Sequence, residues 1–263
     1  MKKILLLTLF LGMIVVRSFG QLVDEQNVTI TLDLQPVLQL NMTTPDQIDF
    51  VFDQIPEYYG GEIKYAGTIL QVSSTVTWDL WAVGTSQTAQ AAGGLYWDLQ
   101  MPYNQGAGGI NALTTIPLSA LELHQYPVNA YINTATDDYS AQFVANTTPQ
   151  TDQVATNSIF ESATPYTAPV LGNKYIMGDA GIAAAGVGGV PGGSYLANGS
   201  NSDYYITIDY RILPGLPTVF PMATDITGTT NESMDVAPAV NADAYAAPGV
   251  YTMDVKYILA EDQ

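Results

Sequence analysis

Cysteine is absent from this sequence, and histidine occurs once, as His124. These absences exclude thiol catalysis, disulfide-stapled folds and zinc sites built from cysteine and histidine clusters. No Gly-x-Ser-x-Gly elbow is present to supply a nucleophile, so we interpret His124 as a structural or surface residue. The glycine-rich stretch 186–193 lacks the Lys-Ser/Thr ending of a phosphate-binding loop, which argues against nucleotide chemistry.

Basic residues are also scarce, with seven Lys and Arg against 25 Asp and Glu and a formal charge of −18. A surface this acidic repels phosphate backbones and anionic lipid, so we expect neither nucleic acid nor an electrostatic membrane contact. Charged residues make up only 12% of the chain and hydrophobic ones 47%, unlike a disordered chain. The composition therefore predicts a folded, acidic protein.

Long apolar runs are missing except at the N-terminus, where residues 4–16 follow two lysines. Small residues come next, and this order predicts a secretory signal peptide over residues 1–20, cleaved after Gly20. The alternative is an N-terminal membrane anchor, but Arg17 ends the run early for a spanning helix. We therefore expect a secreted protein at the extracellular cell surface, with no membrane span after signal removal.

Removal of residues 1–20 would leave four basic residues against 25 acidic ones, a formal charge of −21. Such a surface favours solubility and attracts hard divalent cations. Without disulfides, an exported chain of this size must gain its stability from a large buried core or from subunit contacts.

Apolar and polar residues alternate near both ends of the remaining chain. In residues 28–34 the period is two, as expected of a strand with one buried face. Its apolar members are Val28, Ile30, Leu32 and Leu34. The same alternation predicts strands over residues 48–52, 72–83, 204–212 and 251–259. Residues 119–125 are predicted as either a short helix or a further strand.

The middle of the chain is rich in glycine, alanine, asparagine and threonine, and its strand signals are scattered. Short strands are predicted over residues 96–101, 113–123, 129–133 and 140–145, and an irregular flexible loop over residues 178–199. We therefore predict an all-β fold: one antiparallel Ig-like β-sandwich domain, residues 21–263, with a long loop-rich insertion over about residues 85–202. A second β subdomain within that insertion is the alternative.

Two short motifs lie near the ends of this predicted sandwich. Trp78-Asp79-Leu80 follows a Ser/Thr-rich strand and recurs as Trp97-Asp98-Leu99, and a Pro-Gly turn precedes Tyr257-Ile258-Leu259. These features resemble the WxL-type surface domains of bacteria, which are exported β-sandwiches associated with cell walls. Tyr257 stands where that family has Trp. Pilin-like surface subunits share the style of the last strand, so the resemblance implies a β-sandwich at a cell surface.

Carboxylates and aromatic residues are the remaining candidates for a site. Glycoside hydrolysis needs two acids across a sugar, and the candidates are Glu57, Glu62, Glu122, Glu161 and Glu232. Alternation places Trp81 on the polar side of its strand, where it could stack on a sugar ring. Its candidate companions are Tyr58, Tyr59 and Tyr103. The alternative, which we favour, is that Trp81 packs under the insertion.

Three aspartates, Asp137, Asp138 and Asp203, are weak candidates for a structural calcium ion. Carboxylate oxygens suit calcium, but no Asp-x-Asp-x-Asp-Gly loop is present. We expect no other cofactor.

The sequence thus predicts a non-enzymatic structural protein of the cell surface. Residues 28–34 form an alternating strand on a free terminus, and such a strand can add to the open sheet of another subunit. We therefore expect self-association into an extracellular fibre or surface assembly. The same strand could instead close its own domain. The alternative function is an adhesin that binds cell-wall or other glycans, and a glycosidase is the third hypothesis.

Overall fold

The computed structural model describes residues 26, 28–54, 57, 61–87, 95–103, 112–113, 116–132, 138–144, 157–164, 166–170, 174–180, 188–197, 204–213, 245–246 and 248–262. The chain divides into two units, residues 1–35 and residues 36–263. The predicted signal peptide lies outside the described residues and stays a prediction.

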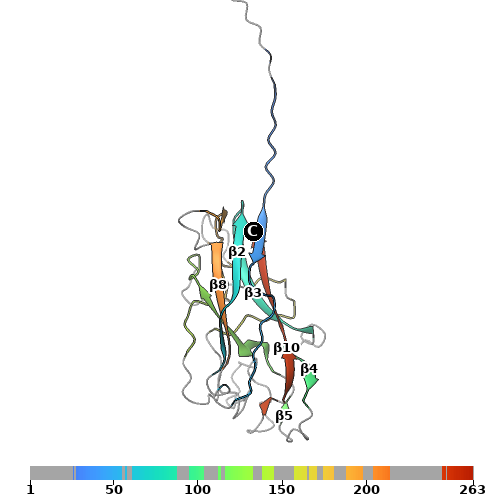
Figure 1. Cartoon of the computed structure of the whole chain (residues 1–263). Coiled ribbons are helices and arrows are strands. Elements are labelled where there is room, and N and C mark those ends of the chain that lie inside the picture. Colours follow the sequence, from blue (N-terminus) through green and yellow to red (C-terminus); the bar gives the residue numbers. More distant parts are fainter. Residues whose placement is uncertain are drawn as a thin grey trace, which may run out of the picture. The chain divides into compact units, whose positions relative to one another are not determined.

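The first unit is described at residues 26 and 28–35. Figure 1 shows residues 28–35 as an extended chain, and they carry no strand assignment. The alternating pattern predicted a strand here, and the backbone is extended as expected, but among the described residues it pairs with no other strand.

The second unit contains a five-stranded antiparallel sheet. Its order is β1 (Leu38–Met42), β2 (Ile63–Ser74), β8 (Tyr205–Ile212) and β6 (Leu121–Tyr126), and the short β7 (Gly193–Ser194) also pairs with β2. Figure 1 shows β2 and β8 side by side. The 3₁₀ turn η1 (Leu118–Ala120) leads directly into β6, so the predicted helix or strand over residues 119–125 is mainly a strand.

The second layer is built on β3 (Trp78–Thr85), which pairs antiparallel with β11 (Asp254–Glu261) along the full length of both strands. On its other edge β3 forms isolated bridges to residues 161, 177 and 190. Two smaller sheets complete the described strands. β10 (Gly249–Thr252) pairs antiparallel with β4 (Asp98–Pro102), and β5 (Ala112–Leu113) pairs parallel with β9 (Tyr245–Ala246).

The core lies between these two layers. Alternate residues of β2 and β8, such as Leu70 and Ile208, pack against alternate residues of β3, such as Trp78 and Leu80. All four side chains are almost completely buried. The fold is therefore all-β with a sandwich-like core, as the period-two alternation predicts.

A chain of hydroxyl groups crosses this core. The Thr68 Oγ1 on β2 and the Tyr210 hydroxyl on β8 are 2.6 Å apart, and the Tyr210 hydroxyl also bonds that of Tyr257 on β11. Tyr257 thus ties the two layers together. Its pKa lies well above the usual range because burial disfavours the phenolate.

Several predicted strands differ from the observed ones. Residues 72–83 are two strands joined by a turn at 75–77, where the Thr75 N–H donates to the Val37 carbonyl. Residues 48–52 are not a strand, although Ile48, Phe50 and Phe52 pack against the core as the alternation implies. The described parts of 129–133 and 140–145 are turns and irregular chain, because their backbone groups bond to neighbouring side chains.

The predicted insertion contributes to the main core. β6 lies in the five-stranded sheet, and Ile159, Ile176 and Val190 are buried in the central cluster. In the predicted loop 178–199, the described residues 188–194 pack against β2 and β3 through Val190 and β7. Those residues are therefore packed chain, which corrects the prediction of a flexible loop for them.

Candidate functional site

The most unusual feature of the described chain is the exposed apolar stripe on residues 28–34. Val28, Ile30, Leu32 and Leu34 are 77–88% exposed. The intervening residues are exposed as well, and the hydrogen bond recorded in this segment joins Gln35 Nε2 to Asp33 Oδ1. The four side chains predicted for assembly thus share one strand face and are all accessible.

Such a stripe is costly to leave in water. Single exposed apolar residues are common on proteins, whereas contiguous exposed apolar patches are often sites of interaction. Burial of each would contribute about 1.5–3 kcal/mol. The unpaired backbone would also gain hydrogen bonds if it joined a sheet.

The outer edge of β11 is open within the described structure. Asp262 N donates to the carbonyl of Thr77, which continues the pairing of β11 with β3. In an antiparallel pair, only every second residue of a strand bonds to the neighbouring strand. The even-numbered residues of β11 therefore bond to β3, whereas Val255, Tyr257 and Leu259 direct their backbone groups away from it. No hydrogen bond from these outward groups to another described residue is recorded.

β1 also has an open edge within the described structure. Thr43 N donates to the Ile69 carbonyl, and Thr75 N donates to the Val37 carbonyl. Odd-numbered residues of β1 therefore bond to β2, and Leu38, Leu40 and Met42 direct their backbone groups outward. β1 and β11 lie close to each other in space but share no ladder.

The other sheet edges are covered. Leu123 N donates to the Asn157 carbonyl and Gln125 N to the Tyr139 carbonyl, so β6 is protected by neighbouring chain. The far edge of β3 is covered by residues 160–162, 176–177 and 190. Of the main strands described, β1 and β11 thus provide the open edges, a feature that proteins normally protect.

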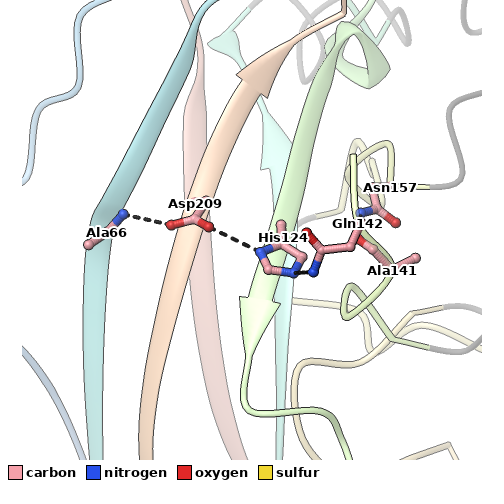
Figure 2. A network of polar contacts seen from close by, with 6 residues as sticks. All are labelled: Ala66, His124, Ala141, Gln142, Asn157 and Asp209. Carbon is pink, nitrogen blue, oxygen red and sulfur yellow. Dashed lines mark hydrogen bonds and ion pairs between the residues drawn. The ribbon is translucent and has the colours of Figure 1, made fainter. Parts of the chain in front are cut away.

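His124 lies in a satisfied polar network (Figure 2). Its Nδ1 is 3.0 Å from Asp209 Oδ2, and its Nε2 is 3.0 Å from Gln142 Nε2. Since an amide nitrogen can only donate, His124 Nε2 accepts from Gln142, and the protonated Nδ1 donates its hydrogen bond to Asp209 Oδ2. Both ring nitrogens are thereby engaged, which supports a structural histidine.

The same network holds an irregularity of β2. Pairing between β2 and β8 shifts between Lys64 and Thr68, where Ala66 adopts a φ of 49°. The Ala66 N–H donates to Asp209 Oδ1 at 2.7 Å, as Figure 2 shows. Asp209 therefore ties this bulge on β2 to His124 on β6.

The candidate acids for glycoside hydrolysis serve the fold wherever the structure describes them. Glu122 pairs with Arg211, and Glu62 pairs with Lys64 and accepts from Val51 N at 3.0 Å. The remaining two described carboxylates, Glu57 and Glu161, cap backbone N–H groups: Glu57 those of residues 53 and 54, and Glu161 that of residue 119. Glu232 lies outside the described residues.

Two half-buried carboxyl groups, Asp79 on β3 and Glu161 on the segment that bridges to β3, have raised pKa values. Burial raises the pKa of Asp79 to about 7, and the nearby charges of Asp262 and Asp179 act in the same direction. Burial also raises the pKa of Glu161 to about 7, opposed by its bond from Ser119 N. Asp79 thus has two acidic neighbours, Asp262 and Asp179, and Glu161 has a backbone partner, so the raised pKa values make the stability of the folded state sensitive to pH.

Of the proposed sugar-stacking residues, the structure describes Trp81 and Tyr103. Trp81 is 4% exposed and packs edge-on against Tyr175 at 5.8 Å between ring centroids. This corrects the exposed position given by alternation and agrees with the alternative that Trp81 packs under the insertion. Tyr103 is 50% exposed beside β4, and Tyr58 and Tyr59 lie outside the described residues.

The calcium candidates fare similarly. Asp138 is buried, and its carboxylate accepts from Asn129 N and from both Ser140 N and Ser140 Oγ. These bonds fix a local turn. Asp137 and Asp203 lie outside the described residues, and no group of metal-ligating side chains occurs among the described ones.

Sequence reasoning found the exposed stripe but missed the open edge of β11. The apolar alternation of a strand such as β11 looks the same whether the strand lies at the centre or at the edge of a sheet. No local signal separates these cases, because edge status depends on which strands lie alongside.

No family model and no curated protein matches this chain. In the part of the chain that the structure describes, no helix has the length and apolar character needed to cross a membrane.

Proposed function

We propose that this protein is a structural subunit of an extracellular assembly, in which residues 28–34 of one copy add as a β-strand to the sheet of another copy. The observation that carries the proposal is the unpaired extended segment with four apolar side chains on one face, each at least 77% exposed. Strand addition satisfies the backbone of such a segment and buries its stripe.

Energetics support this use of the stripe. Four buried side chains would contribute roughly 6–12 kcal/mol at about 1.5–3 kcal/mol each. Association of two proteins costs about 4–15 kcal/mol in lost freedom. The stripe is therefore of the size needed to offset association, with ladder hydrogen bonds adding about 0.5–1.5 kcal/mol each.

A non-enzymatic role agrees with the rest of the described chain. The single histidine has both nitrogens engaged, and the described candidate glutamates are paired or cap the backbone. The adhesin alternative has less support, because Trp81, its main candidate, is buried.

The proposal is tested by adding charge to each face of the segment separately. Ile30→Asp with Leu32→Asp places two carboxylates in the stripe, and Thr29→Asp with Thr31→Asp is the matched control with the same added charge on the polar face. We expect the first pair to abolish assembly in analytical ultracentrifugation and negative-stain microscopy, and the control to retain it.

Circular dichroism should show folded β protein for both variants, because the described segment makes no ladder contact. Loss of assembly in both variants to the same degree would show that charge, and not the apolar stripe, controls association. A wild-type protein that remains monomeric at all concentrations would overturn the proposal.

A further inference from the structure

We infer that the acceptor for residues 28–34 is the open edge of β11 in a second copy, and that the two strands pair antiparallel with Asp33 opposite Lys256. This inference rests on the proposed function and specifies its partner surface. It follows from the direction of the backbone groups of β11, the exposure of the core beside it, the strand lengths and the charges.

The alternating direction of its backbone groups makes β11 a suitable template for an added strand. Val255, Tyr257 and Leu259 present outward backbone groups while their side chains pack against the core. In antiparallel pairing, hydrogen-bonded partners place their side chains on the same face of the sheet. The apolar residues of the donor, when bonded to these positions, would therefore project toward the same core.

Among the described residues, no strand covers the core at this edge. Val255, Tyr257 and Leu259 are only partly buried, whereas the core residues Leu80 and Ala82 of β3 are fully buried. A strand added beside β11 would cover the exposed part of the first three. The incoming apolar side chains would thus be buried where existing apolar surface is incompletely covered.

Length favours β11 over β1. β11 has eight residues and β1 has five. The donor stripe spans the seven residues 28–34, and its four apolar members need four outward positions. β11 supplies these at residues 255, 257, 259 and 261, whereas β1 supplies three, at residues 38, 40 and 42.

Charge selects the register. Lys256 is one of four basic residues beyond the predicted signal peptide, and Asp33 is the acidic residue on the polar face of the donor. Antiparallel pairing of Leu34 with Val255 places Asp33 opposite Lys256 and Thr29 opposite Ala260. An opposite-charge pair across two strands stabilises the pairing, and like charges destabilise it.

The absence of cysteine allows a direct test by disulfide trapping between different molecules. Thr29→Cys protein is mixed under mild oxidation with a separately tagged acceptor that carries Ala260→Cys. Any disulfide between the two forms must be intermolecular, because each copy has a single cysteine. We expect the mixed dimer on non-reducing gels, at least tenfold above the two controls.

The first control acceptor is Asp254→Cys, which keeps Lys256 and lies about 20 Å from the expected partner of Thr29. That distance is too long for a disulfide, which needs Cα atoms within about 7 Å. The second control is Asn41→Cys, which reports the competing open edge of β1. Stronger trapping with Asp254→Cys overturns the register, and stronger trapping with Asn41→Cys overturns β11 as the acceptor.

Microscopy of the same mixtures separates this inference from the proposed function. Assemblies without any of the three disulfides would overturn the β11 acceptor and leave strand addition at another surface. Absence of both assemblies and disulfides would overturn the proposed function as well.

Discussion

Removal of the Arg211 charge should destabilise the fold far more than removal of the whole ion pair. Arg211 on β8 and Glu122 on β6 are both almost fully buried, and the Arg211 Nε donates to Glu122 Oε2. Arg211 Nη1 also donates to the Val144 carbonyl at 2.8 Å, and the guanidinium lies over the Phe143 ring at 4.7 Å. The pair therefore joins two strands and a loop.

The expected magnitude follows from desolvation. Burial raises the pKa of Glu122, and the hydrogen bond and charge of Arg211 partly oppose this shift. Arg211→Met leaves a buried carboxylate without a counter-charge, a change that costs about 3–5 kcal/mol. The double variant with Glu122→Leu removes both charges, and we expect it to recover most of that loss because apolar replacements of buried pairs are often neutral.

Urea unfolding followed by tryptophan fluorescence measures these free energies of unfolding, with the unaltered chain and Glu122→Leu completing the double-mutant cycle. The loss in free energy of unfolding caused by Arg211→Met should become smaller from pH 8 to pH 5, since protonation of Glu122 removes the unpaired charge. A cost below about 1 kcal/mol for Arg211→Met, or a double variant as unstable as the single one, would refute the reasoning.

Three further predictions concern stability and assembly. The folded-state pKa values of Asp79 and Glu161 lie near 7, above their unfolded values, so the free energy of unfolding should fall as pH rises from about 4 to 7. Asp79→Asn with Glu161→Gln should flatten this dependence in urea titrations. A urea midpoint that rises with pH over that range would contradict the prediction. Trp81→Ala should cost about 3–5 kcal/mol in the same assay because its ring is buried, whereas an unchanged midpoint would indicate an accessible ring. In self-assembly, Asp33→Lys should weaken association and Asp33→Lys with Lys256→Asp should restore it in sedimentation runs, and no rescue would count against the proposed register.

Much of the fold could be predicted from period-two alternation. Residues 204–212 and 251–259 correspond closely to β8 and to β10 with β11. Residues 48–52 show the limit of the method, because Phe50 and Phe52 contact the core without joining a ladder. Alternation reports which side chains face apolar surroundings, and it does not report whether a neighbouring strand bonds the backbone.

Trp81 shows a second limit. Alternation placed it on the polar face, yet that face is covered by residues 160, 175 and 180 from the middle of the chain. Two-sided burial of β3 is a product of long-range packing, and the alternation within β3 carries no signal for the distant segments that cover its second face. Trp81 is therefore buried, not on the exposed face where alternation placed it.

By itself, the sequence determined the all-β class and the apolar stripe of residues 28–34, because both depend on side chains at alternate positions of one short segment. Only the tertiary structure decided that no described strand pairs with the outer edge of β11, that Trp81 is covered and that His124 is engaged on both ring nitrogens. Each of these depends on groups far apart in the chain, and their proximity is set by the packing of the whole domain.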